Sequence, residues 1–505
     1  MSDAAPIKTP ASAGVTLPRS LNLLQTSIGE LSSLLAQGAI TSVDLVKAYM
    51  FNIEQNNVNG QELRAIIQVA PLDSVLKIAE GLDRERREGS VRGPLHGIPI
   101  LVKDNIATDV ELGMKTTAGS TALQQSVVPG DAEVIKRLRK AGAIILAKAN
   151  LSELSNFKGQ NTPLGWSAVG GQCRSAYAAG TSACGGSSAG NAVGLSAGFG
   201  AAALCTETSG SLIHPASRAA LYGVRPTTGL VPSDGVVPIS TCRDSLGPMG
   251  FSAADCAFML DGMTFDDGRY AKAANMPLMK DLRLGLVIRN FLEEADGRDI
   301  MPDTPASIET EVIAVRSAAA LMASSGASII EVNMETSYED SQTLVKSEEA
   351  LFQSDFKEDI SVYLGNLVES PILDIEDLVQ WHIDHASVEL PPYAPSQSRL
   401  IASLSAPSRD SDVYRHNQAI SKKIARTNGL DYIFDKFNLD AAVFAVDLGP
   451  AHKYVSAAGY ALGTAPLGYA NNGVPFGILF AVRGGEEERL ISILQVFSRL
   501  YLKSS

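Results

Sequence analysis

Apolar positions recur along the chain with two periods, which predict helices and strands in alternation. After Ser27 and Thr41 the apolar residues return every three or four positions, as is typical of one buried helix face. The segment Ser27-Ile28-Gly29-Glu30 is also a capping box, in which serine and glutamate satisfy N–H groups at a helix start. The elements predicted from the first part of the chain are helices beginning after Ser27 and Thr41, a strand over 65–69, a helix over 72–87 and a strand over 98–102 that ends at Lys103.

The alternation continues toward the C-terminus. Asp131 is predicted to cap a helix that Gly142 ends, and Asn472-Gly473 is predicted to turn the chain between 466–469 and a strand. Further predicted elements are strands over 143–146, 284–288, 328–332 and 476–482, and helices over 307–321 and 490–500. Continuously apolar strands between amphipathic helices indicate a sheet covered on both faces, hence an α/β fold.

Residues 335–440 are the least regular part of the chain, because they are polar and interrupted by prolines. We interpret them as a variable segment that shapes the substrate site of this protein. Residues 1–20 are rich in Ala, Pro, Ser and Thr and are predicted to be a loose N-terminal tail. No repeat, coiled coil or flexible linker divides the remainder, so we predict a single domain over residues 21–505.

Composition narrows the class of protein. The 505 residues carry 42 Lys and Arg against 55 Asp and Glu, a net charge of −13, which argues against a nucleic-acid partner. No apolar segment approaches the roughly 20 residues of a membrane helix, and the start lacks the basic and apolar regions of a secretory signal. The five cysteines are scattered and odd in number, which favours reduced thiols. We therefore expect a cytoplasmic protein that does not bind membranes.

The candidate chemistry lies in an unusual stretch of small residues. Of the 27 residues over 185–211, 18 are Gly, Ala or Ser, which allows backbone and hydroxyls to approach a ligand closely. Serines stand at both ends, as Ser187-Ser188 and as Ser209 and Ser211. With Lys103 at the end of an apolar strand, they suggest a nucleophile activated without histidine. The alternatives are that Ser187 caps a helix over 188–198 and that Lys103 is a solvated strand end.

A nucleophile elbow is one alternative for the same stretch. Residues 186–190 match the pattern G-x-S-x-G of α/β-hydrolases, and His452 follows Asp447 in the order which that fold requires. The elbow should come directly after a strand, however, and residues 177–182 read as a turn. The missing strand disfavours a nucleophile elbow, although the order of Asp447 and His452 along the chain does not exclude it.

Two further motifs carry less weight. A phosphate-binding loop would end in Gly-Lys-Ser/Thr, and no lysine lies between Lys158 and Lys272. His382 and His385 could bring two imidazoles together, but they lack the metalloprotease spacing and a third ligand. We interpret them as part of a surface helix and predict no metal site.

Several segments together resemble the amidase signature hydrolases, which use a Ser–Ser–Lys triad. Within that family, residues 150–157 and 165–168 and the pair Thr206-Glu207 are most similar to the peptide-amidase-like branch. The segments that carry the resemblance are His96–Pro99, Val102–Asn105, Thr116–Ser120, Ala147–Glu153, Gly185–Ser188, Thr206–Ser211, Gly223–Thr227, Asp244–Met249 and Val474–Gly477.

The chain departs from the family pattern near the expected nucleophile. Relatives tend to have Gly where this chain has Cys205, and Asp where it has Ser209. Arg225 replaces a usual Lys, and Ala189 a usual Gly. The lost acidic side chain affects the expected substrate preference. It does not affect the expected catalysis, because backbone N–H groups supply the oxyanion donors.

The resemblance implies a mechanism. Ser211 attacks a carboxamide carbonyl, Ser187 relays the proton, and neutral Lys103 is the final base. The pKa of Lys103 must then lie below the usual ~10.4, which burial can achieve. The resemblance also implies a cis bond between Gly186 and Ser187, and an oxyanion hole formed by the N–H groups of Thr208, Ser209, Gly210 and Ser211.

The resemblance further implies an α/β fold with a large twisted mixed sheet covered by helices on both faces, and no cofactor or metal. The expected partner is a small amide substrate, and a homodimer is left open. The pocket is expected to be walled by 335–440 and 455–470. Two other functions are kept: an amidotransferase A-type subunit that releases ammonia from glutamine within a complex, and an α/β-hydrolase-like esterase.

Overall fold

The computed structural model describes residues 22–178, 180–266, 268–275, 279–289, 291–292 and 307–504. The predicted N-terminal tail, residues 1–20, lies outside these ranges. Within them, no helix is long and apolar enough to cross a membrane.

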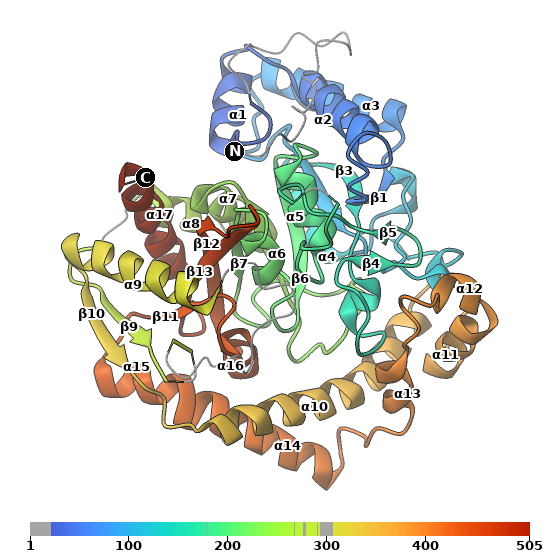
Figure 1. Ribbon diagram of the computed structural model, residues 1–505. Helices are drawn as coiled ribbons and strands as arrows, with labels where there is room; N and C mark the ends of the chain where they lie inside the picture. The colour runs from blue at the N-terminus through green and yellow to red at the C-terminus, as the bar shows by residue number, and fades with distance from the viewer. Residues whose placement is uncertain are drawn as a thin grey trace.

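One large mixed sheet runs through the molecule (Figure 1). Eleven strands of the described residues form it, and the predicted α/β architecture is confirmed. The strand order is β1 (Ile66–Val69), β3 (Ile144–Ala149), β2 (Pro99–Lys103), β6 (Ala202–Glu207), β8 (Ser245–Gly250), β7 (Tyr222–Arg225), β12 (Ala461–Tyr469), β13 (Pro475–Val482), β11 (Ala441–Ala445), β9 (Arg283–Val287) and β10 (Ser328–Val332). The parallel pairs are β2 with β3 and β6, and β9 with β10 and β11.

Helices cover both faces of this sheet. On β12 the two neighbouring residues Gly463 and Thr464 face opposite sides, as the period of a strand requires. A side-chain atom on Gly463 would meet Leu490 and Leu494 of α17 (Glu487–Ser504). Thr464 lies instead beside Gly223 and Gly477, on the side of α6 (Ile213–Ser217). The predicted covering on both faces is therefore confirmed.

The helices predicted after Ser27 and Thr41, over 72–87, before Gly142 and over 307–321 are present as α1 (Ile28–Ala36), α2 (Ser42–Asn56), α3 (Leu72–Arg87), α4 (Glu133–Lys140) and α9 (Ile308–Ser324). Helices α7 (Ala253–Thr264), α8 (Arg269–Asn275) and α16 (Ala451–Ala458) were not predicted. The capping boxes at Ser27 and Thr41 are formed, and β12 and β13 meet at the predicted turn at Asn472-Gly473. A further helix is α5 (Ala189–Ser196).

The predicted cap at Asp131 is wrong. The N-cap of α4 is Ala132, and no side chain caps this helix. The Asp131 carboxylate is used elsewhere, because it accepts a hydrogen bond from Asp109 N–H and pairs with Arg139.

Residues 335–440, predicted to be irregular, are mostly helical. Helix α10 alone spans Tyr338–Gly365, and Ser337 closes a capping box at its start. The prolines that suggested irregularity all lie between helices, where they end one and precede the next. The remaining helices of this part are α11 (Ile375–Asp384), α12 (Ala386–Glu389), α13 (Ser398–Leu404), α14 (Asp412–Lys422), the π-helix Lys423–Leu430 and α15 (Asp431–Phe437).

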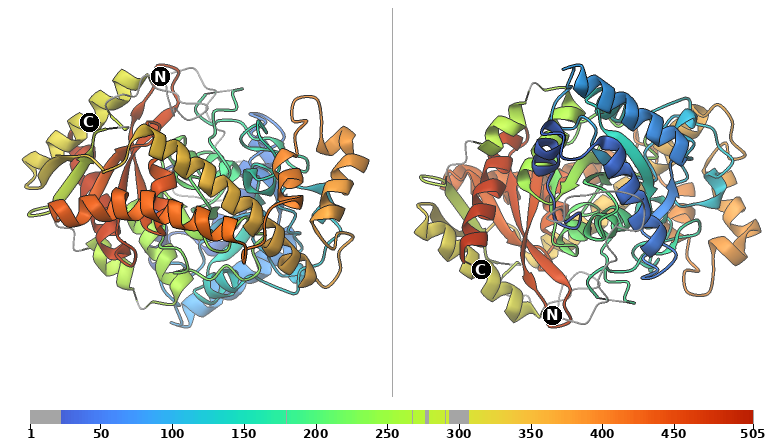
Figure 2. Two further views of the ribbon diagram at one scale, coloured as in Figure 1. Left: turned by 90° about the horizontal axis from the view of Figure 1, so that it is seen from below. Right: turned by 90° about the horizontal axis from the view of Figure 1, so that it is seen from above.

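These helices form a layer of their own along one side of the molecule. Helices α10 and α14 lie side by side across it, and α11 to α13 lie at its end (Figure 2, left). A second, smaller hydrophobic core lies beneath this end. It joins Phe356 of α10 and Leu378 of α11 to Leu154 and Phe157, which belong to the segment after β3.

We predict that Leu101→Ala will destabilise the protein strongly. Leu101 is fully buried on β2, and the absence of side chains at Gly194 and Gly200 leaves the room that it fills. Removing it leaves a cavity beside the strand that carries Lys103, at a cost of about 2–5 kcal/mol. Unfolding in denaturant measures this, with Leu72→Ala, at a position 47% exposed, as the control. Equal losses in both variants would contradict the prediction.

Candidate active site

Lys103 is buried, not solvated, at the end of strand β2. Its Nζ lies 2.7 Å from Ser187 Oγ, 2.8 Å from Thr206 Oγ1 and 3.1 Å from the Thr206 carbonyl oxygen. Strand β6, which carries Thr206, is the parallel neighbour of β2 and therefore ends at the same edge. Sequence reasoning brought Lys103 and Ser187 together but missed Thr206 as a second hydroxyl on the amine.

Burial lowers the pKa of Lys103 from its usual range to about 7. Water stabilises an ammonium far better than a protein interior does, so a buried lysine loses its proton more easily. Cys205, Asp244 and Glu207 raise the pKa by their charge, but less than burial lowers it. None of these three side chains forms a hydrogen bond to Lys103 among the described residues, which leaves the hydroxyls as its side-chain partners.

Ser187 is placed by the backbone on both sides of it. The Gly186–Ser187 bond is cis, as the family resemblance implied, and the Ser187 carbonyl accepts a hydrogen bond from Ser152 N–H at 3.0 Å. Ser187 does not cap a helix, since α5 begins at Ala189 and has Ser188 as its N-cap. The Ser188 hydroxyl donates to the Thr206 carbonyl at 3.2 Å, so it is engaged in holding the fold.

Ser211 lies in the loop between β6 and α6. Its carbonyl accepts a hydrogen bond from Ser188 N–H at 2.9 Å, which joins its loop to the one that carries Ser187. Gly210 before it has φ +91°, and a side-chain atom there would come within 2.6 Å of the His214 ring. Only glycine therefore fits at Gly210. The N–H groups of Ser209, Gly210 and Ser211 donate no hydrogen bond to other described residues, so they are available to an oxygen of a ligand.

A small cavity of about 80 Å³ opens in front of this loop. Ser211 is half-buried at its wall, whereas Lys103 and Ser187 lie behind the wall, fully buried. A larger hollow of about 830 Å³ lies between residues 107–137 and the end of α10, but it includes none of these three. We take the smaller cavity as the candidate site because it contains Ser211. Its lining residues are Asn156, Leu164, Gly185, Gly186, Ser209, Gly210, Ser211, His214 and Arg218.

The Glu207 side chain holds the loop that carries Ser211, a role that the sequence analysis missed. Its Oε2 accepts hydrogen bonds from Leu212 N–H and Ile213 N–H at 2.8 and 2.9 Å, which fixes the chain directly after Ser211. Its Oε1 lies 3.6 Å from Arg225 Nε, and both side chains are fully buried. The departure from the family's lysine at Arg225 thus places a guanidinium against this carboxylate.

The histidines form a different arrangement from the one that an esterase triad needs. His452 Nδ1 lies 3.2 Å from His214 Nε2, and the Asp447 carboxylate pairs with Arg218 at 2.6 and 2.9 Å. Burial lowers the pKa of His214 to about 4, so this imidazole is neutral at neutral pH. Residues 173–188 contain no strand in the part that the structure describes, so the context of a nucleophile elbow is lacking.

The prediction of a surface helix around His382 is wrong for that residue. His382 is fully buried, against Gln397 and Ser120, whereas His385 is exposed and stacked on Trp381. The pattern of two histidines three residues apart did not reveal which of them faces inward, because the helix layer that covers His382 comes from distant parts of the chain.

The chain is similar over nearly its whole length to known amidases. The family described as Amidase matches residues 44–453. A protein of Schizosaccharomyces pombe named as a candidate amidase is 32% identical, over 94% of this chain and 85% of its own length. The native peptide amidase of Stenotrophomonas maltophilia has the same fold, with a TM-score of 0.85 and 31% identity over 95% of this chain and 97% of that one.

A second group of relatives matches only part of the chain. The A-type subunit of the glutamyl-tRNA(Gln) amidotransferase of Geobacter sulfurreducens is 33% identical, over 57% of this chain and 59% of its own length.

We predict that Arg225→Met will destabilise the protein because it leaves the Glu207 carboxylate buried without its cation. Losing one partner of a buried pair costs about 3–5 kcal/mol. Arg225 also donates to the carbonyls of Tyr460 and Arg243, at 2.7 and 2.8 Å, which lysine cannot match with one nitrogen. The melting temperature measures the loss. Arg415→Met, which breaks an exposed ion pair with Asp412, is the control and should change it little.

Proposed function

The chain belongs to the amidase signature family, and on this premise we propose that it hydrolyses a carboxamide through an acyl-enzyme on Ser211. The observation that carries the proposal is the 2.7 Å contact between the amine of buried Lys103 and the Ser187 hydroxyl. A base with a pKa near 7 is half neutral at neutral pH, and it can take a proton from a hydroxyl without help from histidine.

The proposed reaction has two stages. Ser211 Oγ attacks the carbonyl carbon while its proton passes to Ser187, and the Ser187 proton passes to neutral Lys103. The tetrahedral adduct collapses when the leaving nitrogen takes a proton from Ser187, which Lys103 reprotonates. Water then attacks the ester on Ser211 by the same relay, so that the carboxylic acid leaves and the free serine is restored.

The backbone supplies the charge stabilisation in this proposal. The backbone N–H groups of residues 208–211 donate no hydrogen bond to another described residue. In the proposed reaction they would donate to the carbonyl oxygen that becomes negative. Glu207 holds the loop, so these donors are oriented before the substrate arrives. Each proton is carried by a side chain of this protein, which is why we propose no cofactor or metal for these steps.

The proposed substrate is a neutral amide. Arg218 in the cavity wall is paired with Asp447, so the wall presents no free charge there. We propose that residues 21–505 act as one unit. The expected pocket wall from 335–440 and 455–470 is wrong for the cavity at Ser211, because all its lining residues lie between Asn156 and Arg218. The likeness to a peptide amidase makes amidated peptides part of the substrate range to be tested.

An amidotransferase A-type subunit is the second candidate, supported by the partial likeness to such a protein. In that case the same triad would release ammonia from glutamine for a partner protein. The likeness to a peptide amidase over nearly the full length favours the free hydrolase. The esterase alternative lacks its elbow and its triad contacts.

We predict that the reactivity of Ser211 will rise with pH through an apparent pKa near 7. Protonated Lys103 cannot accept the proton that Ser187 relays, so the rate should be low below this pH and reach a plateau above it. The rate at which a fluorophosphonate labels Ser211 measures this, with the adduct mapped by mass spectrometry.

Lys103→Ala should abolish that pH dependence together with most of the labelling. Lys103→Arg should not restore it, because guanidinium stays charged. A His214→Ala variant is the control for a histidine base, and it should keep the acid limb. Labelling of Ser188 or Ser245 instead of Ser211, or a limb that survives in Lys103→Ala, would contradict the assignment.

We predict that the purified chain alone will hydrolyse simple carboxamides without ATP, glutamine or tRNA. A panel of primary amides, anilides, amidated peptides and esters, assayed as release of ammonia, amine or acid, is the measurement. Ser187→Ala should slow turnover by about 10²–10⁴-fold, since it interrupts the relay. Turnover that requires glutamine and partner proteins would favour the amidotransferase, and turnover of esters alone would favour an esterase.

A further inference from the structure

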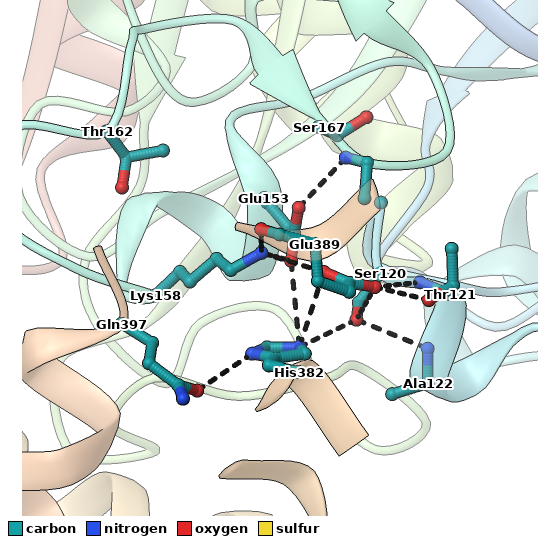
Figure 3. Close-up of polar contacts among 12 residues, drawn as sticks. Ser120, Thr121, Ala122, Glu153, Lys158, Thr162, Ser167, His382, Glu389 and Gln397 are labelled. Carbon is teal, nitrogen blue, oxygen red and sulfur yellow. Dashed lines mark hydrogen bonds and ion pairs between the residues drawn. The ribbon is translucent and has the colours of Figure 1, made fainter. Parts of the chain in front are cut away.

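A cluster of buried charged groups lies where the helical layer meets the segment after β3 (Figure 3). Lys158 stands at its centre. Its Nζ donates to Glu153 Oε1 at 2.6 Å, to Glu389 Oε2 at 2.7 Å and to the Glu389 carbonyl at 2.5 Å. His382 Nε2 lies 3.5 Å from Glu389 Oε2, and all four side chains are fully buried. None of these residues belongs to the proposed proton relay.

The cluster could be taken for a metal site, but the lysine already supplies its cation. Glu153, His382 and Glu389 each offer one ligand atom, all within 4.8 Å of one another. Lys158 bonds to both carboxylates, so a metal ion would have to displace its ammonium. Burial opposes ionisation of Glu389, but His382 and Lys158 lower its pKa to about 2, whereas burial and Glu389 raise the pKa of Glu153. The amine of Lys158 thus lies between the two carboxyl groups, where a metal ion would have to bind.

The segment between Glu153 and Lys158 has an unfavourable backbone. Leu154, Ser155 and Asn156 have φ of 50°, 55° and 72°, which places three successive non-glycine residues in the left-handed region. Residues other than glycine rarely adopt this conformation, because their Cβ atom crowds the backbone. It persists only where the surrounding structure imposes it. Here a member of the charged cluster stands at each end of the turn.

The turn reaches the cavity through one residue. Asn156 lines the cavity together with Ser211, and its amide side chain forms no hydrogen bond to another residue in the described ranges. Its carbonyl accepts a hydrogen bond from Arg399 Nη1 at 2.9 Å, and the next residue, Phe157, packs on Phe356 at 4.7 Å between ring centroids. Helices α10, α12 and α13 therefore hold the turn from outside.

We propose that Lys158 is a positioning residue that holds the turn over 153–158 in its left-handed conformation, and that Asn156 at its tip selects substrates with a second amide group. The free carboxamide of Asn156 can both donate to a carbonyl and accept from an N–H group. An acyl group that carries an amide, as in a peptide, satisfies it, whereas a hydrocarbon of the same size leaves it unpaired. This inference rests on the proposed function, because it assumes that the acyl group occupies the cavity in front of Ser211.

Two primary amides of equal length test this selection. N-Acetylalaninamide carries the second amide, and in 2-methylpentanamide two methylene groups replace it. The measurement is the concentration of each amide that halves the rate of fluorophosphonate labelling at Ser211, a binding readout that does not require turnover. Asn156→Ala should weaken protection by N-acetylalaninamide roughly 5- to 10-fold and leave 2-methylpentanamide nearly unchanged.

Lys158→Met should show the same selective loss, since the turn relaxes when its central cation is removed. Because this variant leaves Glu389 charged and buried, Lys158→Met with Glu389→Gln removes both charges and should fold while keeping the selective loss. Arg409→Gln is the matched control. It breaks ion pairs with Asp355 and Asp359 in the same helical layer, away from the turn, and should leave both amides unchanged.

The outcomes separate the inference from the proposed function. Equal weakening of both amides in the Asn156 and Lys158 variants, or no change in either, overturns the inference. A selective loss in Asn156→Ala but not in the double variant overturns the role of Lys158 alone. Labelling of a serine other than Ser211 in the unmodified protein contradicts the proposed function instead.

Discussion

A lysine amine kept away from water at the end of a buried strand is the constraint on which the rest of the site depends. Lys103 can be a base only if its proton is lost near neutral pH, and burial in the sheet lowers its pKa far enough. This requires a buried strand, and β2 lies inside the sheet between β3 and β6 with all its residues buried. It also requires hydroxyls rather than carboxylates as side-chain partners, and Ser187 and Thr206 meet that need.

Lys158 illustrates the opposite use of the same side chain. It is as deeply buried as Lys103, but two carboxylates and a carbonyl surround its amine. These three hydrogen bonds join the segment after β3 to α12, so Lys158 is suited to hold segments together. The partners, and not burial alone, therefore decide between a base and a structural cation.

The loop that carries Ser211 depends on backbone geometry more than on its side chains. Gly210 is required by the nearby His214 ring, and Glu207 fixes the chain on the other side of Ser211. Ser209, where relatives carry an acidic residue, lies at the cavity wall and bonds to none of these groups. This is why the departure at Ser209 is compatible with an intact site and bears on what the cavity admits.

The sequence by itself determined the elements with strong local signals and the residues that end them. The capping boxes at Ser27 and Thr41, the strand that ends at Lys103 and the turn at Asn472-Gly473 follow from neighbouring residues and were predicted correctly. The resemblance through residues 96–211 also brought Lys103 and Ser187 into one site.

Only the tertiary structure decided how distant segments complete that site. The segment over 335–440 was predicted to be irregular because its prolines obscured the helical pattern. In the structure it is mostly helical, and its apolar faces are buried against the rest of the chain. The burial of His382 and the pairing of Lys158 with Glu389 join residues far apart in sequence. Such contacts depend on which surfaces meet after folding. Local periodicity carries no record of that, so these contacts could not be derived from the sequence.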